Sequence, residues 1–387
     1  MPCGCQPDRI HLLNGAPKGP SSAQKQDLAV AQTRGILASL VDKTDHLVRI
    51  SAADVDEIDD SASDSFLPWT RQFFDDDPLS KTHISGDEIQ QRKILDLCIE
   101  FRDIFRNELD DKPAAIPPFH LVVDDLKWKV TSNRTPPRPQ STENQKDIVR
   151  QIKTLEEKGI IEKSESAYYS QVLMVPKPDG SRRLCIDYRN LNDCTVDASW
   201  PIPNISNMLQ RIGSQKPKIF GTMDLTQGYH QAPLTMQTRA FTSFIAFCGV
   251  YQFTRLPFGL KRAPSYFQEV MATFVLAGLI HITCEMYIDD CNVFGQTTDE
   301  FIARLKQIFE RFRKYHIFLK ASKCFFGYTE IDFVGKVISE EGLKMSRSKI
   351  QNVLDFPLPS ISKQLKSFLG LVNYFRDFVK NHSNIVN

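Results

Sequence analysis

The chain has 387 residues, of which 41% are hydrophobic and 25% charged, and its formal net charge is +1. This composition excludes a wholly disordered or fibrous protein, and the length suffices for a large core and more than one domain. Residues 42–111 carry 19 acidic against 8 basic side chains, whereas residues 112–387 carry 26 against 36. The basic rear part could attract a polyanion, although an ordinary solvated surface explains the same excess.

Cysteine usage and hydropathy indicate the compartment. The 9 Cys are scattered, and no apolar signal segment follows Met1. The longest apolar stretch, residues 272–280, is too short for the roughly 20 residues that span a membrane. We therefore expect an intracellular, cytoplasmic protein with no transmembrane segment and no membrane partner.

The front half of the chain changes character twice. Residues 1–88 lack sustained periodicity and predict a low-order acidic region. Residues 89–140 predict a helix over 89–105, followed by a proline-rich connector with a strand at 119–123. A helix is expected over 141–158, and strands over 170–176 and 183–188 flank an Asp179-Gly180 turn.

The rear half continues with alternating helices and hairpins. We expect a strand over 218–224, a helix from Pro264 to about residue 277, and a hairpin over 285–294 with Asp289 and Asp290 at its turn. A helix over 298–316, strands near 324–327 and 331–338, and helices over 348–356 and 362–380 follow. Without a strict strand–helix–strand rhythm, these elements predict an α+β fold.

Three carboxylates carry the most informative pattern. Asp224 ends a predicted strand, and Asp289 and Asp290 lie in a Tyr-Ile-Asp-Asp tetrapeptide. Phosphoryl transfer requires neutralised and aligned phosphates, which two divalent ions provide, and Mg²⁺ prefers oxygen ligands such as carboxylates. A Tyr-x-Asp-Asp tetrapeptide alone is more often a solvated turn. The context, Asp224 followed by the Leu-Pro-Phe-Gly-Leu run at 256–260, favours the chemical reading.

In this order the motifs resemble a reverse transcriptase, specifically the polymerase region of a gypsy-type LTR retrotransposon polyprotein, over about residues 95–385. The resemblance implies a right-hand polymerase fold, with fingers and palm over 141–340 and the start of a helical thumb over 341–387. It also implies an RNA-directed DNA polymerase that uses a primed RNA or DNA template, dNTPs and two Mg²⁺ ions, with Mn²⁺ as the alternative metal. Such an enzyme is expected in a cytoplasmic particle with access to the nucleus.

The resemblance assigns the catalytic residues. Residues 222–231 match the first catalytic motif, so Asp224 and the backbone carbonyl of Leu225 are expected to bind metal. Asp289 and Asp290 complete the ligand set. Tyr229 falls where the family places an aromatic plate that excludes a ribose 2′-hydroxyl, and a half-buried core aromatic is the alternative.

Further residues are assigned to the nucleotide and the template. Phe258 and Gly259 are expected at the incoming nucleotide, although Phe258 could simply pack. Residues 175–192 resemble the fingers hairpin, in which Lys177 and Arg183 would hold the triphosphate. Arg182 is the alternative if the register shifts, and ordinary surface charge is the other reading. Template or primer contacts are expected at Arg189, which could instead pair with Asp187, and at Gln268 and Tyr287.

The sequence also lacks parts of the family pattern. It ends at Asn387, about where the thumb would continue, and the RNase H and integrase domains of a full-length polyprotein are not in it. We therefore expect a fragment or a truncated copy. An RNA-dependent RNA polymerase is disfavoured by Tyr229, and a decayed or domesticated nucleic-acid-binding scaffold is disfavoured by the intact carboxylates.

Overall fold

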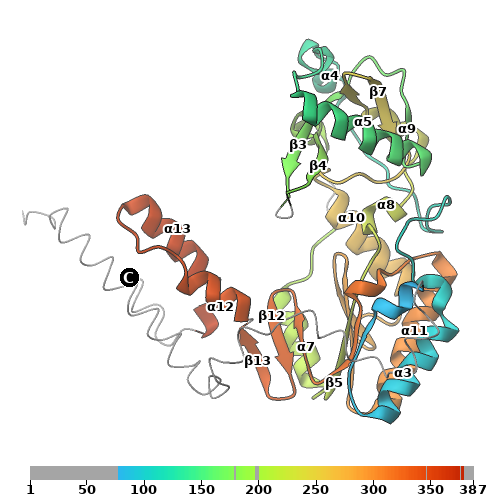
Figure 1. Cartoon of the computed structure of the whole chain (residues 1–387), viewed down its shortest axis with the longest axis vertical. Coiled ribbons are helices and arrows are strands. Elements are labelled where there is room, and N and C mark those ends of the chain that lie inside the picture. The colour runs from blue at the N-terminus through green and yellow to red at the C-terminus, as the bar shows by residue number, and fades with distance from the viewer. Residues whose placement is uncertain (1–76, 178–179, 197–199, 346, 375, 379–387) are drawn as a thin grey trace, which may run out of the picture. The chain divides into compact units, whose positions relative to one another are not determined.

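The computed structural model describes residues 77–177, 180–196, 200–345, 347–374 and 376–378 (Figure 1). The chain divides into two compact units, one of residues 58–344 and the other of residues 1–57 together with 345–387. Most of the region predicted to have low order, residues 1–76, lies outside the described residues. The last part of that region is regular. Pro78–Lys81 forms a 3₁₀ turn, and β1 (His83–Ile84) pairs with Phe325 and Phe326.

The larger unit contains a five-stranded sheet, called the first sheet, that is antiparallel except at its β1 edge. Its strands follow the order β1, β10 (Phe325–Tyr328), β5 (Ile219–Asp224), β9 (Asp290–Gly295) and β8 (Cys284–Tyr287). The predicted strand over 218–224 and the hairpin over 285–294 are therefore confirmed. The two turn residues of that hairpin are Ile288 and Asp289, because Asp290 already pairs with Tyr287.

Helices cover one face of the first sheet. α3 (Glu88–Glu100) and α11 (Thr298–Tyr315) contact each other and the sheet (Figure 1). α11 begins where Thr297 accepts a hydrogen bond from the Glu300 amide and ends at His316, which adopts a left-handed conformation. Its apolar stripe is fully buried: Phe301, Leu305, Ile308, Phe309 and Phe312. α10 (Ala263–Val270), continued by a π-helical turn over Met271–Val275, belongs to the same core.

A separate apolar cluster covers the other face of the first sheet. It joins α7 (Ile205–Ser214) and the small sheet of β11 (Glu330–Phe333), β12 (Lys336–Ser339) and β13 (Gly342–Met345) to Phe220 and Phe294. The prediction of one strand over 331–338 is wrong. Val334, at a φ of 52°, and Gly335, at 74°, turn the chain back, so that Phe333 pairs with Lys336 in a hairpin.

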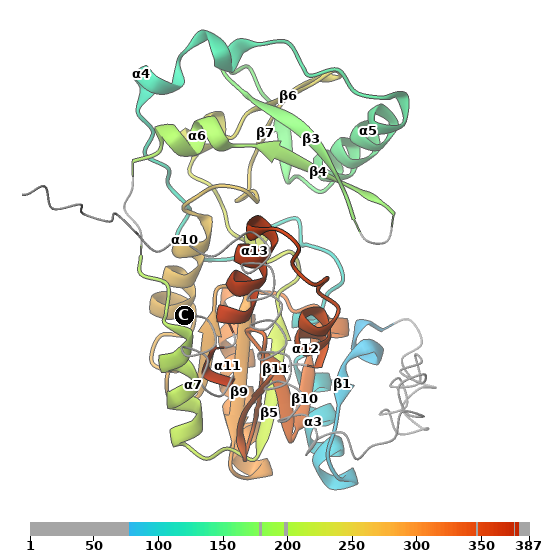
Figure 2. The same cartoon turned by 90° about the vertical axis from the view of Figure 1, so that its left-hand side faces the viewer.

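The second sheet has the order β2 (Ile161–Lys163), β7 (Gly249–Phe253), β6 (Phe244–Ala246), β3 (Ser170–Pro176) and β4 (Arg182–Asp187). α5 (Thr142–Glu157) contacts β2 and β4 (Figure 2), and its Ile148 and Ile152 are buried. The predicted helix over 141–158 and the two predicted strands are confirmed. The expected strand at 119–123 is wrong, because only isolated bridges form there, at Phe119 and Val123.

The remaining helices are short or belong to the other unit. The short ones are α4 (Asp125–Trp128), α6 (Arg189–Cys194), α8 (Gly228–Gln231) and α9 (Met236–Phe241). The smaller unit contributes α12 (Arg347–Leu354) and α13 (Ser362–Asn373), joined by ring contact between Phe356 and Phe368. In the described part of the chain, no helix is long and apolar enough to cross a membrane. Mixed helices and mainly antiparallel sheets confirm the α+β class.

Candidate active site

The three predicted carboxylates meet at one corner of the first sheet. Asp224, the last residue of β5, lies directly opposite Asp290, the first residue of β9. Asp289 precedes it in the turn, where Ile288 adopts a φ of 60°. A β-branched residue rarely takes this left-handed conformation, so the tight turn stores strain at the site. Strand register and turn geometry thus bring together residues that lie 65 positions apart in the sequence.

The carboxylates influence one another electrostatically. Partial desolvation, together with repulsion from Asp289 and Asp224, raises the pKa of Asp290 to about 6. The pKa of Asp289 is raised as well, mainly by desolvation and then by Asp224. This crowding of like charges favours a bound cation, because a cation would relieve the repulsion.

A lysine that the sequence analysis did not single out also reaches this corner. Lys323 Nζ donates a hydrogen bond to Asp224 Oδ2, which raises the pKa of the lysine. Lys323, Asp224 and Asp290 line a cleft of about 320 Å³ together with Asp332 and six further residues. No spacing rule connects residues 99 positions apart, and only the pairing of β10 with β5 brings the lysine to the carboxylate.

The donor set suits a hard divalent ion. Three carboxylates on paired strands and their turn are the oxygen ligands that Mg²⁺ prefers, and Mg²⁺ keeps several waters, so few protein ligands suffice. Within the described ranges, no three Asp, Glu, His or Cys side chains lie close enough together to hold a metal ion as they stand. The backbone of Leu225 lies next to Asp224 and bridges to Leu319. Its predicted role as a metal ligand stays a prediction.

Tyr229 lies beside the carboxylates. Its ring is half-buried, with centroids 5.1 Å from Phe258 and 5.5 Å from Phe267. Desolvation, and next the negative charge of Asp289, raises the pKa of Tyr229 to about 12. The helix that carries it starts close to the turn, since a Cβ added at Gly228 would lie 3.7 Å from that of Asp289. Tyr229 is therefore near enough to contact a group bound at the carboxylates.

The predicted nucleotide-binding loop continues this surface. Phe258 is 52% exposed and covers one edge of Tyr229. Gly259 has a φ of 96°, and its carbonyl accepts a hydrogen bond from Asn192 Nδ2. A Cβ at Gly259 would stand 3.5 Å from the Tyr188 ring in a conformation that L residues rarely adopt. Glycine thus meets a backbone requirement here, and contact with a nucleotide stays a prediction.

Gln268 is buried next to the carboxylate hairpin. Its side chain is 1% exposed, and its amide spans the carboxylate hairpin. Nε2 donates to the Met286 carbonyl at 3.1 Å, and Oε1 accepts from the Ile288 amide at 2.7 Å. A buried amide engaged at both ends holds the hairpin in place, and contact of Gln268 with template or primer stays a prediction. Tyr287, also expected at the template or primer, is half-buried opposite Asp290.

The second sheet carries the basic side chains of the predicted fingers hairpin. Arg183 is exposed and makes no ion pair with a described residue, whereas Arg182 is held by Glu143 at 3.0 Å. Lys177 is half-buried at the end of β3, and its backbone carbonyl accepts from the Gly180 amide. Both arginines stay candidates for the triphosphate, and Arg183 differs from Arg182 in making no ion pair with a described residue.

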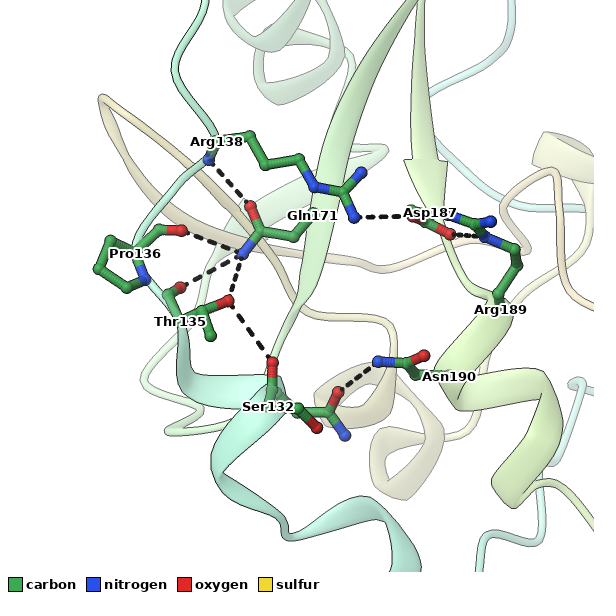
Figure 3. Close-up of polar contacts among 9 residues, drawn as sticks. Ser132, Thr135, Pro136, Arg138, Gln171, Asp187, Arg189 and Asn190 are labelled. Carbon is green, nitrogen blue, oxygen red and sulfur yellow. Dashed lines mark hydrogen bonds and ion pairs between the residues drawn. The ribbon is translucent and has the colours of Figure 1, made fainter.

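Arg189 forms the ion pair that the sequence analysis weighed against a template contact. Both Nε and Nη2 of Arg189 lie 2.7 Å from the carboxylate oxygens of Asp187, and Arg138 approaches the same carboxylate at 3.1 Å (Figure 3). These hydrogen bonds lower the pKa of Asp187 to about 2. Gln171 ties the segment before Arg138 to β3 by bonding Thr135 and Pro136 (Figure 3). Template contact by Arg189 stays a prediction.

Comparison with known proteins identifies relatives. Residues 175–338 match the family model described as reverse transcriptase (RNA-dependent DNA polymerase). The Pol polyprotein of transposon 412 from Drosophila melanogaster is 32% identical over 315 residues, which cover 79% of this chain and 25% of the relative. That of transposon gypsy, from the same organism, is 33% identical over 244 residues, or 62% of this chain and 23% of the relative. The chain spans about a quarter of the length of these curated relatives.

Solved structures show the same fold. A foamy viral protease–reverse transcriptase in complex with double-stranded DNA superposes with a TM-score of 0.69 at 23% identity, covering 83% of this chain and 65% of that one. The same kind of protein in complex with an RNA/DNA hybrid gives a TM-score of 0.64 at 22% identity, covering 80% and 40%.

Proposed function

The chain carries a reverse transcriptase domain of the type found in LTR-retrotransposon Pol polyproteins, and from this premise we propose that it is an RNA-directed DNA polymerase. Because it spans about a quarter of such polyproteins, we propose that it acts as the polymerase portion of a longer product. The observation that carries the proposal is the corner where Asp224, Asp289 and Asp290 meet beside Tyr229.

The proposed reaction adds one dNTP to a primer. The primer 3′-hydroxyl attacks the α-phosphate, a new phosphodiester bond forms, and pyrophosphate leaves. Two Mg²⁺ ions, or Mn²⁺, would neutralise the attacking and leaving oxygens when bound. Asp224, Asp289 and Asp290 would hold them, with the Leu225 carbonyl as a further ligand. The turn positions Asp289 and strand pairing positions Asp290, so little reorganisation would be needed at the moment of reaction.

Nucleotide and template are assigned to separate surfaces. Lys177 and Arg183, which makes no ion pair with a described residue, would approach the triphosphate as a point charge and a planar fork. Tyr229, supported on its outer edge by Phe258, would stand beneath the deoxyribose and leave no volume for a 2′-hydroxyl. Primed RNA or DNA is the proposed partner because related folds are known in complex with double-stranded DNA and with an RNA/DNA hybrid.

Primer extension tests the proposal. Full-length chain, oligo(dT) annealed to poly(rA), dTTP and Mg²⁺ should yield stepwise elongated primers, and Mn²⁺ should be tried in parallel. Elongation requires both the carboxylate corner and a hybrid-binding surface. If folded protein binds the hybrid but extends nothing with either metal, the chain is a nucleic-acid-binding scaffold and the proposed activity is wrong.

A further inference from the structure

Lys323 is held at the carboxylate corner by the backbone around it. The 3₁₀ turn over Ala321–Lys323 is joined to the end of β5 by the Lys320 amide, which donates to the Asp224 carbonyl at 3.0 Å. The Lys323 amide in turn donates to the Lys320 carbonyl at 2.9 Å. Two residues after Lys323, β10 begins and pairs with β5. Strand pairing and the turn therefore direct this long side chain to Asp224.

The contact places a positive charge where the negative charge is densest. Lys323 Nζ donates to Asp224 Oδ2, with side chains 55% and 25% exposed. Of the ten residues that line the cleft, Lys323 is the one with a basic side chain, and three of the others are aspartates. The ammonium group thus offsets part of the repulsion between Asp224, Asp289 and Asp290.

We propose that the Lys323 ammonium group takes the place of a metal ion at this site. It donates a hydrogen bond to Asp224 Oδ2 in the metal-free protein and must release that oxygen before a divalent ion can bind to it. The inference rests on the proposed metal-binding role of the three aspartates. Lys323 is then a positioning residue that acts through Asp224. It keeps the corner assembled without metal and lowers the apparent metal affinity, because the ion competes with a hydrogen-bonded ammonium group.

Direct metal binding, without nucleotide or primer, tests the inference. Mn²⁺ is titrated into the full-length chain, and the free ion is followed by its electron paramagnetic resonance signal. Lys323→Met should bind about fivefold more tightly than the parent, the ratio that matches an exposed ion pair of about 1 kcal/mol. Lys323→Arg should bind like the parent, because it keeps a cation and donors within reach.

Lys320→Met is the matched control. It removes one positive charge from the same segment, and the Lys320 side chain makes no ion pair or hydrogen bond with any described residue. If Lys323→Met binds Mn²⁺ no more tightly than Lys320→Met, only general charge matters and the inference is overturned. A tighter Lys323→Met together with an unchanged Lys320→Met supports competition at Asp224.

Thermal melting supplies a second readout. Without metal, Lys323→Met should melt lower than Lys320→Met, and saturating Mn²⁺ should remove that difference. A difference that persists at saturation would mean that the lysine is merely structural. Asp289→Asn separates this inference from the proposed function: if it binds Mn²⁺ as the parent does, the metal-site assignment fails, whatever the lysine variants show.

Discussion

Gln268 should hold the carboxylate hairpin, and replacing it with methionine tests this. Methionine has a similar length and volume and leaves the site packed, but it can neither donate to the Met286 carbonyl nor accept from the Ile288 amide. Each of the two buried groups left unpaired costs about 1 to 3 kcal/mol, so the substitution should destabilise the protein by about 2 to 6 kcal/mol in total. That is a large part of a typical stability of about 5 to 15 kcal/mol, yet it leaves the chain folded.

Two measurements follow the effect. Urea denaturation monitored by circular dichroism should show a lower midpoint, and hydrogen exchange should show faster exchange in a peptide containing Ile288. Because Asp289 follows Ile288 in the turn, the rate of nucleotide incorporation should fall about tenfold to a hundredfold, while hybrid affinity is kept. Gln91→Met is the matched control, since Gln91 donates a single exposed hydrogen bond to the Gly86 carbonyl. It should change stability by less than about 0.5 kcal/mol.

The reasoning would be refuted by a Gln268→Met protein that matches Gln91→Met in denaturation midpoint and keeps slow exchange at Ile288. The turn would then be fixed by the strands alone. Loss of hybrid affinity without loss of incorporation rate would instead return Gln268 to the template or primer contact expected from the sequence.

Three further outcomes are expected. Tyr229→Val should admit UTP opposite a poly(rA) template, raising kcat/KM for the ribonucleotide, while Tyr229→Phe should keep discrimination; equal selectivity in single-nucleotide kinetics would make Tyr229 a packing residue. Arg183→Ala should raise the KM for dTTP about tenfold through loss of a charge-assisted bond, whereas Arg182→Ala, which breaks only the exposed pair with Glu143, should leave it nearly unchanged. In metal-free buffer, the pKa of Asp290 is about 6 in the folded chain, so the folded chain retains a proton that the unfolded chain releases. The melting temperature should therefore fall as the pH rises from about 4 to about 6. Asp290→Asn should flatten that part of the profile.

The sequence predicted those helices and strands that are marked by nearby capping residues, apolar spacing or turn residues. α5 has capping residues and apolar spacing, and β3 and β4 flank a turn, so each is visible within about 20 residues of sequence. The hairpin at residues 330–339 was not predicted. Its turn residues are Val334 and Gly335, and valine has a high strand propensity, so the local sequence indicates one continuous strand. The apolar side chains of the hairpin pack with Phe220 and Phe294 in one cluster, and the local pattern does not contain those two partners.

The same distinction between local sequence signals and contacts made only in the folded chain applies to the site. Asp224, Asp289 and Asp290 stand in recognisable motifs, and the sequence alone predicted that they would act together. The roles of Lys323 and Gln268 depend on which strand or helix lies next to the carboxylates. Lys323 reaches Asp224 across the pairing of β10 with β5, and Gln268 reaches the hairpin from α10. Such partners become visible only when the sheet is assembled, because no sequence spacing encodes them.

Asp289→Asn, measured for incorporation and for binding in one preparation, tests the central claim most directly. The substitution keeps the size of the side chain and removes its charge, so dTTP incorporation on a primed poly(rA) template should fall about a thousandfold or more, equivalent to about 4 kcal/mol of transition-state stabilisation. Affinity for the RNA/DNA hybrid should stay within about twofold of the parent. Asp332→Asn, which changes an exposed acid of the cleft that Asp224 and Asp290 line, should retain most of the rate. If Asp289→Asn keeps the parental rate, or loses binding and incorporation to the same extent, the carboxylate corner is not the catalytic centre.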